Sequence, residues 1–265
     1  MERAIIWRGL MAGALAGGLA FIWAKIFIEP IIGRAIDFED GAAAAHQAME
    51  AAAGHGHSHG EGGELFSRGI QSNIGMGLGV LLFSIAMGGL FAVVFCAVHG
   101  RFRVSTRALS VLVAGGMLIS LWIVPALKYP PSPPATSLDE TIQQRALLYL
   151  LVMFLSAAVL VAAGYLGSAL APKLGAWNAT LTAGIAYITA MAVVFLALPS
   201  IDETPGPITD EAGTIVFPGF PAADLYEFRL YSLVTQVIIW ATIGLVSAAS
   251  FSKLLDGKRQ DALAA

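Results

Sequence analysis

Three histidines alternate with small residues between Gly54 and Glu61, in the order Gly-His-Gly-His-Ser-His-Gly-Glu. Neutral imidazole is a ligand for divalent cobalt, nickel, copper or zinc. The small residues between His55, His57 and His59 would let the chain wrap three rings around one ion. Glu61 adds a carboxylate directly after the tract. The pattern therefore predicts a binding site for a divalent transition metal.

His46 and Glu50 precede this tract in an alanine-rich run. If the run is helical, the two side chains lie one turn apart on the same face and add to the metal site. Because the neutral imidazole binds the metal, capture should weaken as the pH falls through about 6.5, the ordinary pKa of histidine. The alternative is a solvated linker without a ligand. Metal binding is favoured because four of the chain's five histidines lie in this one polar stretch.

Apolar segments on both sides of this stretch must position it. Hydrophobic residues make up 57% of the chain and charged residues 12%, a balance typical of an integral membrane protein. A bilayer-spanning helix needs about 20 mainly apolar residues. Six segments meet this need: residues 5–28, 75–98, 108–127, 146–170, 177–198 and 232–251. We expect an all-α integral membrane protein in which residues 1–265 form a single domain, a bundle of six transmembrane helices.

The first segment also has features of a secretory signal, since Arg3 and Arg8 precede an apolar core rich in alanine and glycine. However, this core continues through Trp23, and Lys25 near its far end can extend its amine to the membrane surface. We therefore expect a retained helix.

The charges are distributed unevenly between alternate connections. Nine of the 15 lysines and arginines lie in residues 1–8, 99–107, 171–176 and 252–265, whereas 15 of the 18 acidic residues lie in the other connections. We expect the protein to lie in the cell membrane, the inner or plasma membrane. The positive-inside rule then places both termini on the cytoplasmic side. The outer loops become 29–73, which is rich in histidine and acid, and the proline-rich 128–145 and 199–231. We expect the loop 29–73 to be largely flexible, because glycine, alanine and charge dominate it. The chain carries no basic stripe of the kind that binds nucleic acid.

Glycines recur at four-residue spacing in the first segment, at Gly9, Gly13 and Gly17. Small residues at this spacing let helix backbones approach closely. The stripe therefore predicts tight packing of this helix, either inside the bundle or against another copy of the chain.

The spans offer few metal ligands. No Asp or Glu lies centrally in any of them, although a divalent-ion transporter is expected to have polar groups near the midplane. Cys96 and His99 are either a transient ligand pair at the cytoplasmic exit or a buried thiol with an interfacial ring, and the second interpretation is favoured. Glu29, before Pro30, either lies at the outer mouth or ends the first helix.

Prolines and aromatic residues mark the two later outer loops, where proline predicts rigid, extended segments. Arg229 there is expected to pair with Glu227 or another outer carboxylate. The marking motifs are Lys128-Tyr129-Pro130-Pro131-Ser132-Pro133-Pro134, the turn with Leu198, Pro199, Glu203 and Pro205, and the run Phe217-Pro218, Leu225-Tyr226 and Phe228-Arg229. With Glu29-Pro30 and Arg145, they resemble the family of probable cobalt transporter subunits called CbtA over most of the chain.

The resemblance implies cobalt uptake linked to cobalamin supply, with a small single-helix, histidine-bearing CbtB-like subunit as partner. The divalent metal would be the substrate of the transporter, with cobalt preferred over nickel or zinc. No prosthetic cofactor is expected. The resemblance transfers no ligand set. Because the sequence contains no GxxxxGK[ST] motif, ATP would require another chain. A rival interpretation is a metal-uptake component of the vitamin-transporter kind. The best-known cobalt and nickel version begins Met-His, whereas this chain begins Met1-Glu2, which makes the rival less attractive.

Two functions from different classes stay open. The first is a permease in which the histidine tract captures the metal. The second is a non-transporting membrane metal-binding or assembly protein, whose loop buffers or senses metal for a partner complex. Enzymatic activity is not expected, because the sequence lacks an HExxH pair and a nucleophile with a credible base.

Overall fold

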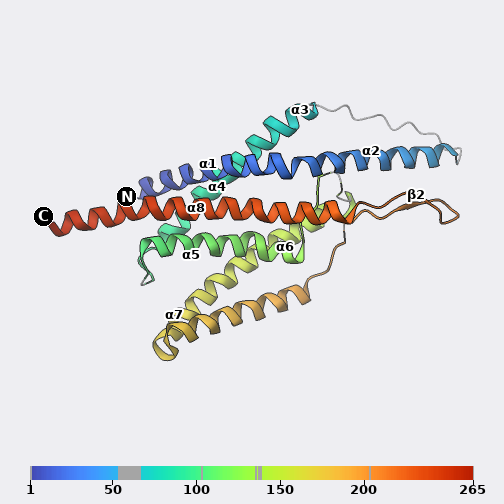
Figure 1. Ribbon diagram of the computed structural model, residues 1–265. Coiled ribbons are helices and arrows are strands. Elements are labelled where there is room, and N and C mark those ends of the chain that lie inside the picture. Colours follow the sequence, from blue (N-terminus) through green and yellow to red (C-terminus); the bar gives the residue numbers. More distant parts are fainter. Residues whose placement is uncertain are drawn as a thin grey trace.

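The computed structural model describes residues 2–52, 67–102, 104–134, 136, 139–202 and 204–264. Helices dominate these residues (Figure 1). The elements are α1 (Glu2–Phe27), α2 (Glu29–Ala52), α3 (Arg68–Ile70), the π-helical turn η1 (Gln71–Gly75), α4 (Met76–Val98), α5 (Thr106–Leu118), the π-helical turn η2 (Ile119–Ile123), α6 (Val124–Lys128), α7 (Asp139–Ala197), β1 (Ile208–Thr209), β2 (Ile215–Phe217) and α8 (Ala222–Ala264).

Five helical stretches of the described chain are long and apolar enough to cross a membrane, which confirms the predicted all-α membrane protein. They are Glu2–Phe27, Arg68–Val98, Thr106–Lys128, Thr141–Ala197 and Ala222–Leu255. The predicted segment 146–170 falls within α7, and 177–198 ends one residue beyond it. The number of spans and the sides of the termini stay predictions.

Gly175 is where α7 changes direction. Its φ of 76° and ψ of 160° are non-helical, and they lie in a region that is open essentially only to glycine. Figure 1 shows the two arms of α7 meeting in a sharp reversal. Each arm coincides with one of the apolar segments found in the sequence.

The glycine stripe of α1 packs against α4, so the predicted close helix contact is confirmed inside this chain. A Cβ atom at Gly13 would overlap the Ser84 carbonyl oxygen, and a Cβ atom at Gly17 would lie 3.0 Å from Leu81 Cα. On the other side of the stripe, a Cβ atom at Gly18 would meet nothing within 4 Å. The two backbones touch because glycine leaves no side chain between them.

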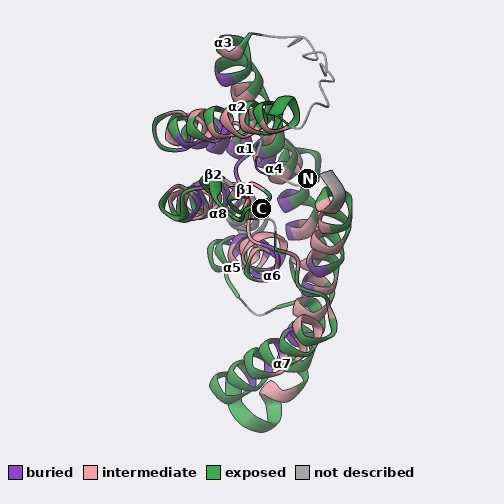
Figure 2. Cartoon of the chain, turned by 90° about the vertical axis from the view of Figure 1, so that its right-hand side faces the viewer, coloured by how far each residue is buried: buried purple, intermediate pink, exposed green. Residues whose placement is uncertain are grey.

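Helix α8 runs between α1 and α5 (Figure 1). Phe251 of α8 packs against Phe95 of α4, with ring centroids 4.8 Å apart. Gly244 allows α8 to approach α5, because a Cβ atom at Gly244 would lie 2.8 Å from the Ala114 methyl group. Helix α7 stands apart from this core and is the least buried of the candidate spans (Figure 2).

The prediction that the first outer loop is largely flexible is wrong for residues 29–52, which form the continuous helix α2. Alanine is the strongest helix former, and the run from Ala42 to Ala52 is rich in it. Helix α2 is also anchored. Phe38 packs on Phe217 and Phe220, with both centroid distances 5.2 Å, and Arg34 pairs with Asp224 at 2.7 Å. The hairpin of β1 and β2 therefore lies against α2 beyond the end of α1 (Figure 1).

Candidate functional site

The predicted metal residues are only partly within the described chain. His46 and Glu50 lie on α2, both exposed and one turn apart, as the alanine-rich run indicated. His55, His57, His59 and Glu61 lie outside the described residues. Within the described residues, no three His, Cys, Asp or Glu side chains gather as a metal site would require. The capture site therefore stays a prediction.

Cys96 and His99 have the contacts of packing residues. The His99 ring stacks on Phe95 with centroids 5.3 Å apart. Cys96 is half-buried against the hydrophobic cluster of α1, α4, α5 and α8. These contacts favour the structural interpretation of the pair.

Glu29 takes part in an ion pair at the start of α2. Helix α1 ends at Phe27, so the chain breaks its helical path directly before Glu29 and Pro30. The Glu29 carboxylate accepts a hydrogen bond from Arg68 of α3 at 2.7 Å. Glu29 therefore ties α2 to α3 where the helix ends.

The segment Lys128–Pro134, the proline segment, is held by arginines from two helices. Arg145 of α7 donates a hydrogen bond to the Pro130 carbonyl, and Arg229 of α8 donates from Nε to the Pro131 carbonyl at 3.2 Å. Proline has a carbonyl oxygen but no N–H, so such a segment needs donors from elsewhere. The two guanidinium groups supply them.

Of the two predicted alternatives for Arg229, pairing with Glu227 is wrong, whereas another outer carboxylate is favoured, because Asp202 lies close enough for its charge to act on Arg229. The Glu227 carboxylate lies 3.5 Å from Arg34 of α2, which also binds Asp224. Two carboxylates on the first turns of α8 thus face α2, while Arg229 turns to the proline segment.

Tyr129 joins the proline segment to the far end of α7. Its side chain is 1% exposed, and its hydroxyl donates to the Pro199 carbonyl at 2.8 Å. Burial raises the pKa of Tyr129, because the anionic form would lose its water. Beside it, Lys128 Nζ donates to the Phe195 carbonyl at 2.8 Å. The two bonds close the α7 hairpin onto α6.

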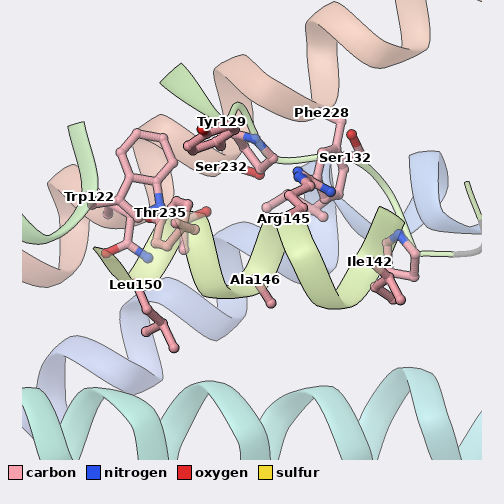
Figure 3. Close-up of a pocket in the computed structure, with 15 residues that line it drawn as sticks. Trp122, Tyr129, Ser132, Ile142, Arg145, Ala146, Leu150, Phe228, Ser232 and Thr235 are labelled. Carbon is pink, nitrogen blue, oxygen red and sulfur yellow. The ribbon is translucent and has the colours of Figure 1, made fainter. Parts of the chain in front are cut away.

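Two cavities open beside the proline segment. The larger, of about 670 Å³, lies between the ends of α1 and α6 and the first turns of α7 and α8. The smaller, of about 260 Å³, lies between the proline segment, residues 200–202, Thr204 and Arg229. Tyr129, Ser132 and Arg145 line both. Figure 3 shows Arg145 rising from α7 toward Ser132 and Phe228.

The family model for CbtA, described as probable cobalt transporter subunit, matches residues 2–252. The chain belongs to the CbtA family. No curated protein and no solved structure matches it. The resemblance inferred from the proline and aromatic motifs is thereby confirmed.

In this CbtA chain, those motifs build the framework at one end of the helical bundle. Arg145 and Arg229 hold the proline segment, and Tyr129 holds the Leu198-Pro199 turn. The Pro205 carbonyl accepts a hydrogen bond from the Phe220 N–H at 3.0 Å. The motifs therefore fasten α6, α7 and α8 to one another at one end of the molecule.

The described charged residues that line the smaller cavity of the CbtA chain are Arg145, Arg229 and Asp202. Arg229 lies close enough to Arg145 and Asp202 to be affected by both charges. The Asp202 carboxylate accepts a hydrogen bond from the Thr204 N–H at 3.0 Å, which lowers the pKa of Asp202. Sequence reasoning missed this arginine-lined site, because its members come from four separate stretches of the chain.

Proposed function

We propose that this chain is the membrane subunit of an uptake transporter for a divalent transition metal, with cobalt as the substrate. The family match over residues 2–252 carries this proposal. The five apolar helical stretches support it, because they give the chain the architecture of a multi-pass membrane protein. Membership of a transporter-subunit family also favours a role without enzymatic chemistry.

In the proposed arrangement the chain has six spans, with both arms of α7 crossing the cell membrane and both termini in the cytoplasm. Helix α2 then projects on the outer side and carries His46 and Glu50 on one exposed face. The histidine tract follows α2 directly. His55, His57, His59 and Glu61 would capture the ion there, and raise its concentration near the spans. Imidazole suits cobalt, nickel and zinc, so selectivity requires geometry beyond the tract.

The proposed transporter includes at least one further subunit. The family description calls CbtA a subunit, which implies a partner in a complex. We propose that this partner is the small single-helix, histidine-bearing CbtB-like protein, and that the cobalt serves cobalamin supply. An ATP-hydrolysing chain would be a separate component.

A second function is favoured by the charges of the cavities. Arg145 lines both cavities and Arg229 lines the smaller one, and these positive charges repel a bare divalent cation. A metal bound near α2 would then stay outside and pass to a partner. In this alternative the chain buffers or delivers metal without transporting it.

Uptake of radioactive cobalt into cells without other cobalt importers tests the capture proposal. We expect the His55→Ala/His57→Ala/His59→Ala variant to lose uptake several-fold at low cobalt and to recover at high cobalt, because a capture loop acts by raising local concentration. His99→Ala is the matched control, since it removes a histidine at the C-terminal end of α4, whereas the histidine tract precedes α4 in the sequence. Equal uptake by the triple variant and the wild type at every cobalt concentration would disprove the role of the tract.

A further inference from the structure

We propose that α6 and α7 swing as one unit about η2, and that a hydrogen bond from Arg101 to Tyr165 holds the far end of this unit against the core of α1, α4, α5 and α8. The swing opens and closes the space between α7 and that core. This inference goes beyond the proposed cobalt uptake and does not depend on it, because it rests on how the described helices are joined.

The span made of α5, η2 and α6 is interrupted at η2. The Val124 N–H donates to the Ile119 carbonyl, five residues back instead of the four of an α-helix. Pro125 comes next and has no N–H, so the Leu121 carbonyl loses its usual donor. The Tyr149 hydroxyl reaches that carbonyl only at 3.5 Å, which is longer than an ordinary hydrogen bond. Because prolines and π-helical turns are common causes of helix kinks, η2 is a natural pivot.

Beyond the pivot, α6 and α7 are fastened to each other. Lys128 and Tyr129 both donate to carbonyls at the end of α7 or just after it, at 2.8 Å each. Val124 packs in the same hydrophobic cluster as Val152 and Tyr187, one from each arm of α7. The helix α6 and both arms of α7 therefore move together.

The contacts of this unit with the rest of the chain lie mainly close to the pivot. Among the described elements, α7 packs mainly on α6 and η2. Just before η2, a Cβ atom at Gly116 would lie 3.3 Å from the Leu160 side chain of α7. Arg229 of α8 donates to the Pro131 carbonyl shortly after the end of α6. The arms of α7 extend away from these attachments to the reversal at Gly175 (Figure 2).

Side chains do not fill the space between the unit and the core. The cavity of about 670 Å³ is lined by Trp122 of η2 and Leu150 of α7, and by Ile28 of α1 and Gln236 of α8. Packed protein interiors leave few voids larger than a water molecule. The unit can therefore change its angle to the core without first separating tightly packed side chains.

Near the far end of the unit, a hydrogen bond closes the gap. Arg101, in the loop between α4 and α5, donates to the Tyr165 hydroxyl of α7 at 3.0 Å. Both side chains are exposed, so water competes for them and the bond contributes little net free energy. A weak bond far from the pivot acts as a latch that thermal motion opens and closes.

Distances between two spin labels on the full chain in liposomes test the swing. In a Cys96→Ser background, labels at Trp177→Cys beside the α7 reversal and Leu245→Cys on α8 report the position of the unit against the core, and both positions are exposed. We expect double electron-electron resonance to show a shorter and a longer distance. Tyr165→Phe removes the hydroxyl that accepts from Arg101, so it should raise the ratio of the longer to the shorter distance about threefold, as expected for loss of one exposed hydrogen bond.

Pro125→Ala tests the pivot with the same label pair. This variant gives the Leu121 carbonyl an N–H donor, so it should stiffen η2 and narrow the distribution of distances. Pro172→Ala is the matched control, because Pro172 also lies inside a helix but beside the α7 reversal. Equal distributions for the two proline variants would overturn the assignment of η2 as the pivot.

A label pair inside the core separates motion of the unit from motion of the labels. Val93→Cys on α4 with Leu245→Cys on α8, both exposed, should give one distance that Tyr165→Phe leaves unchanged. The swing is overturned if the pair across the gap also gives one distance that Tyr165→Phe leaves unchanged, or if the core pair changes as much. None of these readouts requires cobalt, so a failure of cobalt uptake leaves them unaffected.

Discussion

At the scale of single residues, the end of the molecule that holds the proline segment depends on proline carbonyls and on the side chains that donate to them. Arg145, Arg229 and Tyr129 bind the carbonyls of Pro130, Pro131 and Pro199. A buried carbonyl that loses its donor costs about 1–3 kcal/mol. These residues therefore stabilise the ends of α6, α7 and α8.

Tyr129→Phe should lower the free energy of unfolding by about 1 kcal/mol, because it leaves the Pro199 carbonyl without the hydroxyl. Burial raises the pKa of Tyr129, so its contribution is complete below about pH 10, the ordinary tyrosine value, and is lost as the pH rises through the folded value. The stability difference between wild type and variant should therefore shrink at alkaline pH.

Thermal unfolding in detergent between about pH 8 and about pH 11 measures this difference. Tyr226→Phe is the control, because Tyr226 is 66% exposed and should give no comparable change. An unchanged difference across this range would contradict the assigned burial of Tyr129.

The sequence predicted part of this residue-scale picture. Proline alone predicts that the proline segment is rigid, and this follows from its locked backbone angle. The partners could not be predicted, since Arg229 and Pro131 are separated by 98 positions and no periodicity connects them. Glu227 and Arg229 are two positions apart on one helix, where side chains do not face each other, and Glu227 lies beside Arg34 instead.

At the scale of elements, the close contact of α1 with α4 is the tightest packing in the core. The spacing of Gly9, Gly13 and Gly17 predicted such a contact. In α4, Gly88 packs against Gly9 and Ser84 packs against Gly13. The sequence could not select α4 as the partner, because small residues are common in membrane helices.

Gly13→Ala should destabilise the fold by about 1–3 kcal/mol, the usual cost of overfilling a packed interface, since the new methyl group meets the Ser84 backbone. Gly18→Ala, on the open side of the same helix, should be neutral or slightly stabilising, because alanine favours the helix. Thermal unfolding and the yield of monodisperse protein compare the two. Equal stability of both variants would contradict the contact.

Helix α2 shows why polar connections are harder to predict than spans. Composition and charge favoured a flexible loop over residues 29–73. Contacts that hold α2 come from Phe217, Phe220 and Asp224. These residues are distant in sequence from α2, so local sequence patterns do not predict the contacts. The position of His46 and Glu50 on one face of a helix was nevertheless predictable, because the neighbouring residues in the sequence are mainly alanine.

At the scale of the whole molecule, the apolar segments located most of the architecture. Each of the six coincides with a helical stretch of the described chain to within one residue at its end, and the fourth and fifth form the arms of α7. Helix α7 stands beside the core of α1, α4, α5 and α8, and is fastened to it through α6 and η2 (Figure 2). The sides of the membrane depend on the charge bias alone.

Single cysteines test the proposed six spans. In a Cys96→Ser background, we expect Thr214→Cys in the hairpin to react with an impermeant maleimide on intact cells, whereas Lys173→Cys beside the α7 reversal should react after the membrane is opened. Both positions are exposed. The expectation follows from the excess of lysine and arginine on the cytoplasmic side. Labelling of Lys173→Cys on intact cells would contradict this orientation.

Transport itself is tested most directly by radioactive cobalt uptake into liposomes that contain the purified chain, with and without the small candidate subunit. An external chelator separates the two proposed functions, because it removes cobalt bound outside and leaves cobalt that has crossed the membrane. We predict saturable accumulation of chelator-resistant cobalt, at least when the partner is present. If the chelator removes all the cobalt even with the partner, the chain binds metal without transporting it.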